Sequence, residues 1–154
     1  MSFLNAGDVI SGREGTAFMT IDGRNVPMFF LKNIEATVEL VKTEVPVIGK
    51  RMNQQKVTGA NGTGSMTIHK VTSEFAQIGI NYLKSGKIPM ITIKVTNEDP
   101  ASTIGRQSTL LKDVIFDSVV IAKLDIESET LDEDVDFTFA DADLLDMFTT
   151  PKLG

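Results

Sequence analysis

The sequence predicts a mainly β protein, an antiparallel two-sheet sandwich or open β-barrel with one flanking α-helix. Segments in which apolar and polar residues alternate recur along the chain, as in strands with one buried face. Turn-forming residues separate these segments, and only one segment has the 3.6-residue apolar period of a helix. With 154 residues and no internal repeat, the chain is expected to form a single domain over residues 1–154.

Two strands in the N-terminal part are predicted to form a hairpin. Thr16 to Ile21 and Val26 to Leu31 flank an Asp-Gly pair, which supplies the positive φ that tight turns require. Pro27 has no amide hydrogen to donate, so it places the second strand at a sheet edge or a bulge. The next segment, Ile34 to Val41, alternates like a half-buried strand.

Two segments are expected to extend from the domain as arms. Residues 1–12 mix polar residues with glycine, and Phe3 and Leu4 are their candidate anchors. Residues 42–64 combine a short apolar patch, basic residues and a glycine-rich return, with little periodicity. Such a segment is either a surface excursion or a functional loop that becomes ordered on a partner. We favour a protruding arm that docks elsewhere, because its apolar side chains have little reason to face water. The candidate docking residues are Val45, Val47, Ile48, Lys50, Arg51 and Met52.

The segment from Ser73 to Gly86 is predicted to be the helix. Thr72 or Ser73 can cap its N-terminus, and Gly86 is placed for a left-handed residue after its last turn. A helix of this length is marginal alone, so it must lie on an apolar sheet. Its predicted packing face consists of Phe75, Ile78, Tyr82 and Leu83.

The second half of the chain adds further strands. Ser65 to Val71 and Met90 to Thr96 flank the helix, and Leu110 to Glu127 predicts one long strand or two joined at a kink. The alternating residues Val135, Phe137 and Phe139 predict another strand. One helical turn is expected within 141–148.

Charge and composition restrict the function. The net charge is −6, and the stretch from Asp125 to Asp146 holds ten acidic residues and no basic one, which argues against nucleic-acid binding by counterion release. Asp125, Glu127 and Glu129 would project from one face of a strand. This face either keeps the protein soluble or forms a lining from which a polyanion is repelled. No run approaches the ~20 apolar residues of a membrane helix, and no signal peptide is recognised at the N-terminus. We therefore expect a soluble protein made in a cytoplasm.

No motif predicts catalysis, a cofactor or a metal. The chain has no cysteine and one histidine, His69, so neither a metal cluster nor a histidine-based triad is expected. Gly59 to Ser65 lacks the lysine of a phosphate loop. The spacing of Asp132, Asp134 and Asp136 begins like a calcium loop, but Phe137 occupies the glycine position. An enzyme is not expected.

The order of the segments resembles the tail tube protein of contractile, myovirus-type phage tails, in the version found in PBSX-type phage-like elements. The resemblance covers nearly the whole chain and depends on overall pattern, because this family has no catalytic signature. The segments that carry it are the first hairpin and strand, the arm beginning Val45 to Arg51, the return Gly59 to Met66, the helix Glu74 to Lys84 and the acidic hairpin Leu124 to Phe139.

This resemblance implies a tail-tube-like β-barrel domain with a flanking helix, assembled into hexameric rings that stack into a tube for the genome. In that setting the arm, over 42–58, would reach a neighbouring ring, and residues 1–12 would do likewise. We assign Asp125, Glu127 and Glu129 to an acidic channel wall along which DNA slides without specific binding. The implied partners are other copies of the chain and the tail sheath, tape measure and baseplate proteins. The implied location is the tail of a virion or phage-like particle, assembled in the bacterial host cytoplasm.

Two alternatives remain at this stage. One is another tube with the same fold, from a type VI secretion system or a phage-tail-like bacteriocin. The other is a monomeric β-barrel that binds a small ligand, which would require aromatic residues around a cavity. The chain has no tryptophan and one tyrosine, which makes this second alternative the weaker one.

Overall fold

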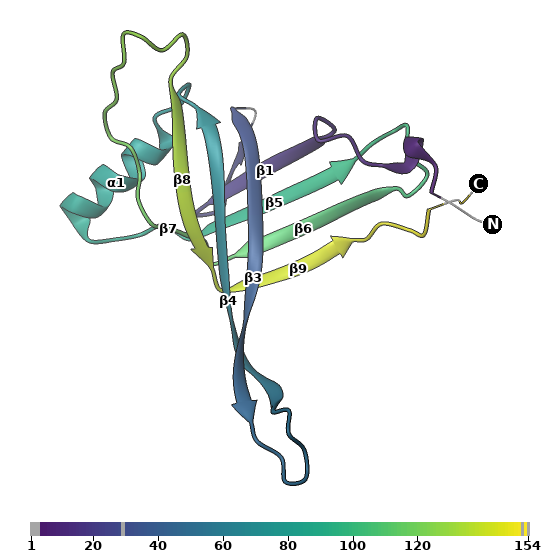
Figure 1. Cartoon of the computed structure of the whole chain (residues 1–154). Coiled ribbons are helices and arrows are strands. Elements are labelled where there is room, and N and C mark those ends of the chain that lie inside the picture. Colours follow the sequence, from purple (N-terminus) through teal and green to yellow (C-terminus); the bar gives the residue numbers. More distant parts are fainter. Residues whose placement is uncertain (1–3, 29, 152, 154) are drawn as a thin grey trace.

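The computed structural model describes residues 4–28, 30–151 and 153. In these residues the chain forms two antiparallel sheets and one α-helix, and the two sheets do not close into a barrel (Figure 1). The first sheet has the order β2-β1-β5-β6-β9 and the second the order β3-β4-β8-β7. The predicted fold class is therefore confirmed. The elements are η1 (Ala6–Asp8), β1 (Gly15–Ile21), β2 (Arg24–Pro27), β3 (Leu31–Val45), β4 (Gln54–His69), α1 (Glu74–Ser85), β5 (Ile91–Glu98), β6 (Arg106–Lys112), β7 (Ile115–Phe116), β8 (Asp132–Phe139) and β9 (Asp141–Asp146).

The predicted N-terminal hairpin is present. Asp22 and Gly23 both have positive φ, 49° and 84°, as a tight two-residue turn between β1 and β2 requires. β2 is an edge strand and ends at Pro27, so the ladder loses no interior hydrogen bond to the proline.

The core lies between the two sheets and is formed by the apolar side of each strand. On β8 the buried residues alternate with exposed ones, as the spacing of Val135, Phe137 and Phe139 predicts. These residues pack with Met66 and Ile68 of β4 and with apolar residues of the other sheet. The most deeply buried members from the first sheet and α1 are Met19, Ile91, Ile93, Leu111 and Phe75.

The helix begins and ends as the sequence predicts. Ser73 is at the N-cap position, and Gly86 has φ 72° and donates its amide hydrogen to the carbonyl of Tyr82 at 2.8 Å. Phe75 is buried and its ring meets that of Phe30 edge-on, with ring centres 6.0 Å apart. Ile78 is also buried.

The packing face of α1 includes fewer buried residues than the sequence predicts. Tyr82 is 49% exposed and Leu83 is 72% exposed, whereas Phe75 and Ile78 are buried. The reason is that the elements beneath α1 cover only its first two turns among the described residues. A small apolar pocket of about 240 Å³, lined in part by Ile78, Tyr82 and Val119, lies under the remaining turn.

The local structure differs from the expected one in three segments. The arm region is a regular hairpin, because β3 and β4 pair as far as Val45 and Gln54; both faces of this ribbon are exposed, so no burial pattern marked it in the sequence. The expected strand Leu110 to Glu127 ends early, since β7 covers only Ile115–Phe116 and residues 117–131 form an irregular loop. The helical turn expected in 141–148 is instead the strand β9, which pairs with β6.

The outer part of the β3–β4 hairpin and the loop 117–131 lie at opposite ends of the four-stranded sheet (Figure 1). The β3–β4 hairpin extends past both sheets at the lower end. The loop 117–131 rises at the other end, beside α1. No helix in the described part of the chain is long and apolar enough to cross a membrane.

Candidate assembly surfaces

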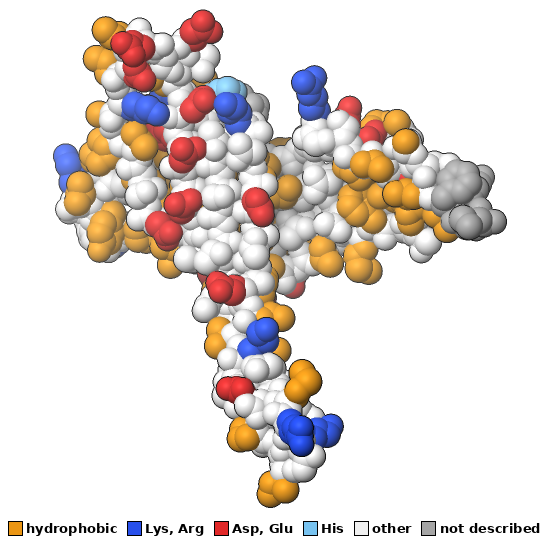
Figure 2. Space-filling model, viewed as in Figure 1, with side chains coloured by type: hydrophobic (Ala, Val, Ile, Leu, Met, Phe, Trp, Pro, Cys, Tyr) orange, Lys and Arg blue, Asp and Glu red, His pale blue; other side chains and the backbone are white. Residues whose placement is uncertain are grey.

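The outward face of the four-stranded sheet is acidic and rich in hydroxyl groups. Along β8 the exposed positions alternate with the buried ones and include Asp134, Asp136 and Thr138. The register places Thr67, Ser65 and Thr63 of β4 directly beside them. β3 adds Glu35, Thr37 and Glu39 on the same face. The part of this face between the levels of Glu39 on β3 and Asp134 on β8 carries four carboxylates, those of Glu35, Glu39, Asp134 and Asp136. Within the described strands it carries no lysine or arginine. We call these four residues the acidic sheet face; Figure 2 shows red side chains over the white strands in this region.

At the end of this sheet near Asp132, basic side chains lie beside acidic ones. The Asp132 carboxylate contacts Nζ of Lys32 at 3.2 Å and Nδ1 of His69 at 2.9 Å. The hydrogen bond from Lys32 is the main cause of the lowered pKa of Asp132, and His69 adds to it. Lys123 donates to the carbonyl oxygen of Asp132 at 2.6 Å. His69 therefore takes part in a polar cluster with Lys32 and Asp132 at the border of the acidic sheet face.

The long strand β3 is an open edge. Its 15 residues pair with β4 on one side and with no other described strand, since β3 is the first strand of its sheet. Val38, Leu40 and Val41 are between 42% and 56% exposed along it. A long, exposed edge with apolar side chains is a site where another chain can add its own strand. The opposite edge, β7, runs antiparallel to β3, so a second copy placed there would continue an antiparallel sheet.

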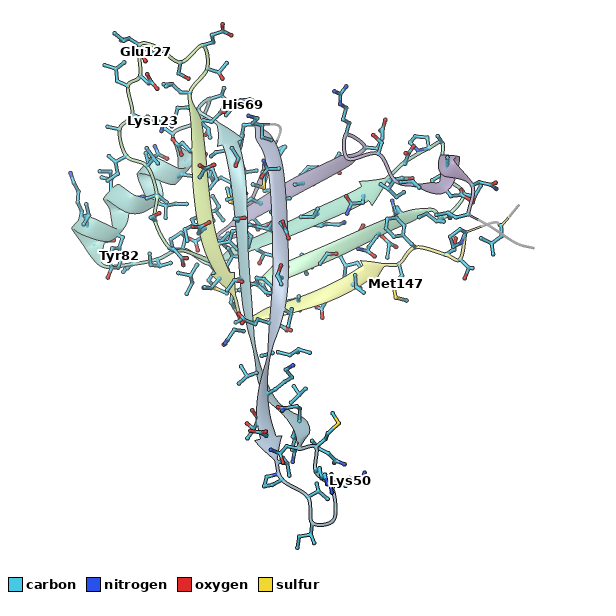
Figure 3. All side chains as sticks on the ribbon, in the orientation of Figure 1. Lys50, His69, Tyr82, Lys123, Glu127 and Met147 are labelled. Carbon is cyan, nitrogen blue, oxygen red and sulfur yellow. The ribbon has the colours of Figure 1, made fainter. Side chains whose placement is uncertain are left out.

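The residues predicted for the arm lie on the outer part of the β3–β4 hairpin. Beyond the pair of Gly62 with Phe139 no third strand of the described part of the chain joins this hairpin, and a two-stranded ribbon is marginal in water. Ile48 is fully exposed and Met52 is 83% exposed, while Val45 is 39% exposed and Val47 is half-buried. Lys50 and Arg51 are also exposed and lie in the turn between the strands; Figure 3 labels Lys50 at the tip.

The three acidic residues predicted to line a channel lie elsewhere. Asp125, Glu127 and Glu129 are on the loop 117–131 and not on a strand, beyond the end of the sheet (Figure 3). Their expected strand face is thus wrong. The acidic sheet face was missed, although Asp134 and Asp136 alternate with Val135 and Phe137 in the sequence. That alternation was the available signal, but choosing the face required the register with β3 and β4.

The described part of the predicted N-terminal arm packs on the body of the protein. Asp8 of η1 is buried and accepts hydrogen bonds from the amide and hydroxyl of Thr103, at 2.8 and 2.7 Å. These two bonds, the hydroxyl first, lower the pKa of Asp8. Ser11 donates its amide hydrogen to Asp99 at 3.0 Å. Leu4 is 54% exposed, and Phe3 lies outside the described residues.

Comparisons with known proteins found similarity over most of the chain. A family model described as "Phage tail tube protein" matches residues 2–146. The phage-like element PBSX protein XkdM of Bacillus subtilis (strain 168) is 45% identical over 141 residues, which cover 92% of this chain and 93% of that protein.

Two cryo-EM structures of contractile assemblies contain chains of the same fold. One is the baseplate of the anti-feeding prophage, with a TM-score of 0.67 at 11% identity over 89% of this chain and 95% of the other. The second is the extended sheath-tube complex of an extracellular contractile injection system called PVC, with a TM-score of 0.62 at 8% identity over 88% and 90% of the two chains. At such identities the similarity concerns the fold alone.

Proposed function

The chain belongs to the phage tail tube protein family, and from this membership we propose that it is the inner-tube subunit of a contractile phage or prophage-derived tail. The family is structural and non-enzymatic. The observation that supports the role as an inner-tube subunit is the combination of an open edge strand, β3, with the acidic sheet face beside it. The edge offers a way to join copies, and the face is suited to a channel for a polyanion.

Rings are proposed to form when β3 of one copy meets the β7 edge of the next. This arrangement continues the antiparallel order of the four-stranded sheet from copy to copy. Closure of the sheet would remove its exposed edges and cover Val38, Leu40 and Val41. Six copies per ring is the number that the family resemblance implies.

The acidic sheet face is proposed to line the channel. DNA carries dense negative charge, so carboxylates at Glu35, Asp134 and Asp136 would repel it and let it pass without specific binding. Hydroxyl groups between the carboxylates add no positive charge. This assignment replaces Asp125, Glu127 and Glu129 as the proposed channel wall, because those residues are on a loop beyond the sheet.

The outer part of the β3–β4 hairpin is proposed to reach a neighbouring ring and bury Ile48 and Met52 there. The tail sheath, tape measure and baseplate proteins are the proposed other partners. The proposed location is the tail of a virion or phage-like particle, assembled in the host cytoplasm.

A second candidate is the inner tube of a contractile injection machine that carries no genome, such as a type VI secretion system or a phage-tail-like bacteriocin. The fold similarity to chains in the anti-feeding prophage and PVC assemblies favours keeping it. Neighbouring genes for a capsid and its packaging machinery would separate the two. A ligand-binding barrel is disfavoured, because core side chains such as Met19, Val135 and Phe137 fill the space between the described sheets.

Negative-stain electron microscopy of the purified chain at rising concentration tests the proposal. Rings or tubes are expected, with the fraction of polymer increasing with concentration. A charged variant of the edge, Leu40→Lys, should weaken this assembly. Monomers at every concentration would contradict the proposed function.

A further inference from the structure

We propose that the tip of the β3–β4 hairpin docks on the loop 117–131 of a copy in the adjacent ring. The inference rests on the proposed tube and names the surface that receives the hairpin. We define the basic tip as residues 42–56 and the acidic loop as residues 117–131. The occupant of the acidic loop is thus a second copy of this chain.

The two segments are placed for an end-to-end contact. The basic tip lies where β4 begins at Gln54, whereas the acidic loop leads into β8, whose first residue pairs with His69 at the end of β4. The 16 residues of β4 therefore separate them, about 50 Å of extended chain. Figure 3 shows Lys50 at one end of the molecule and Glu127 at the other.

The charges of the two segments are opposite and equal. In the basic tip the charged residues are Lys42, Lys50, Arg51 and Lys56 against Glu44, a formal charge of +3. In the acidic loop they are Asp117, Asp125, Glu127 and Glu129 against Lys123, a formal charge of −3. Among the described residues, Lys50 and Arg51 form no ion pair, and neither do Asp125, Glu127 and Glu129. Lys123 donates to the carbonyl of Asp132.

Each segment also exposes large apolar side chains beside its charges. Ile48 and Met52 protrude from the basic tip, 104% and 83% exposed. Leu124 and Ile126 protrude from the acidic loop, 88% and 93% exposed. Isolated surface apolar residues are ordinary, but here two pairs are next to unpaired charges of opposite sign. Apolar contact would supply affinity, and the charges would set orientation and exclude tip-to-tip or loop-to-loop pairing.

The geometry of this contact favours a polymer over a closed dimer. The two surfaces are different and face opposite ways along the molecule, so the contact is heterologous and every copy keeps one free surface of each kind. Repetition of such a contact extends a stack along one axis. The proposed role of Asp125, Glu127 and Glu129 is therefore to hold adjacent rings together.

Charge exchange between the two surfaces is the first test. Lys50→Glu with Arg51→Glu, and separately Glu127→Lys with Glu129→Arg, should each raise the concentration needed for tubes at least about tenfold, because like charges then meet. The chain that carries all four changes should form tubes again near the original concentration. A matched control reverses two exposed lysines, one in the last turn of α1 and one just after it, Lys84→Glu with Lys87→Glu, and should assemble normally.

Disulfide trapping is the second test, and the absence of native cysteine makes it unambiguous. Ile48→Cys combined with Ile126→Cys should give a ladder of covalent multimers after oxidation of assembled tubes. Either single variant should give no ladder. The control pair Ile48→Cys with Leu145→Cys, whose second site is exposed on β9, should give none either.

The outcomes separate this inference from the proposed function. Wild-type tubes, loss of tubes in both charge variants, rescue by exchange and a ladder would support the contact. If wild-type tubes form and the charge variants assemble equally well, or if only the control pair gives a ladder, this contact is overturned but the proposed tube function stands. The receiving surface would then be another part of the subunit or another tail protein. A wild-type chain that never polymerises would instead contradict the proposed function.

Discussion

Gly64 of β4 lies directly beneath the ring of Phe137 on β8. The two residues are cross-strand partners, and a Cβ atom placed on Gly64 would come within 2.6 Å of Phe137 Cε2 and 2.8 Å of the Glu35 carbonyl oxygen. Gly62 and Phe139 repeat the arrangement two pairs along, on the same face, where the distance to Phe139 Cε2 is also 2.6 Å. The aromatic rings thus occupy the space of absent side chains and fix the register that creates the acidic sheet face on the other side.

Replacing this glycine should destabilise the fold. Gly64→Ala is expected to lower the free energy of unfolding by about 1–3 kcal/mol, because both the ring and the backbone of β3 must move. Urea denaturation at a concentration where the chain is monomeric measures the change. Gly59→Ala is the control on the same strand, since its new Cβ would have only Val41 Cβ nearby, at 4.0 Å. Equal losses in the two variants would contradict the proposed role of the aromatic rings.

The ion pair between Arg24 and Glu74 should contribute a small, pH-dependent stability. Its two hydrogen bonds, both 2.8 Å, join β2 to the first turn of α1. The hydrogen bond from Arg24 is the largest cause of the lowered pKa of Glu74, whose ordinary value is 4.5. Because the folded-state pKa is depressed, this contribution is complete above about pH 4.5 and is lost as the pH falls through the lower folded-state value.

Glu74→Gln tests this linkage. At pH 7 the variant should be less stable by under about 1 kcal/mol, since Arg24 is well exposed and solvent screens the pair. Denaturation curves at a series of pH values should show the difference shrinking in acid. A difference that stays constant from pH 7 to pH 3 would argue against the linkage.

Reversing charge on the acidic sheet face should impair DNA passage more than assembly. Asp134→Lys with Asp136→Lys would place cations where DNA is proposed to slide, so DNA should be retained or released slowly. Genome release from particles carrying the variant measures this, with Glu14→Lys and Glu98→Lys, two exposed positions outside the four-stranded sheet, as the charge-matched control. Release at the normal rate from the first variant would count against the proposed lining.

The apolar tip should be needed for tubes but not for folding. Ile48→Asp removes a fully exposed side chain, so the melting temperature should stay within a few degrees of the original while tube formation is lost. Circular dichroism and negative-stain microscopy measure the two properties. Val71→Asp, at another exposed apolar position, should still form tubes. Tubes of ordinary length from the Ile48 variant would refute the tip contact.

Local sequence patterns were sufficient to predict the elements that have one buried face or a specific turn residue. The helix from Ser73 to Gly86, the turn at Asp22 and Gly23, and the alternation around Phe137 all follow from such signals. The outer part of the β3–β4 hairpin gave no signal, because both of its faces are exposed in the single chain. The strand β9 was read as a helical turn, because its strand conformation depends on pairing with β6, which lies about 30 residues earlier in the chain.

The acidic surface was predicted in kind but not in position. Asp134 and Asp136 alternate with buried residues in the sequence, but Asp125 and Glu127 belong to the same run of carboxylates, and the sequence alone does not separate the two groups. Only the register of β8 with β4 and β3 shows that Glu35 shares a face with Asp136 across the sheet. Sequence spacing carries no information on pairings between such distant strands.

A cryo-EM reconstruction of the polymer formed by the purified chain tests the proposed tube most directly. We expect stacked rings in which Glu35, Asp134 and Asp136 face the lumen and β3 of each copy pairs with its neighbour. A tube with these carboxylates on its outer wall, or with β3 unpaired, would contradict it.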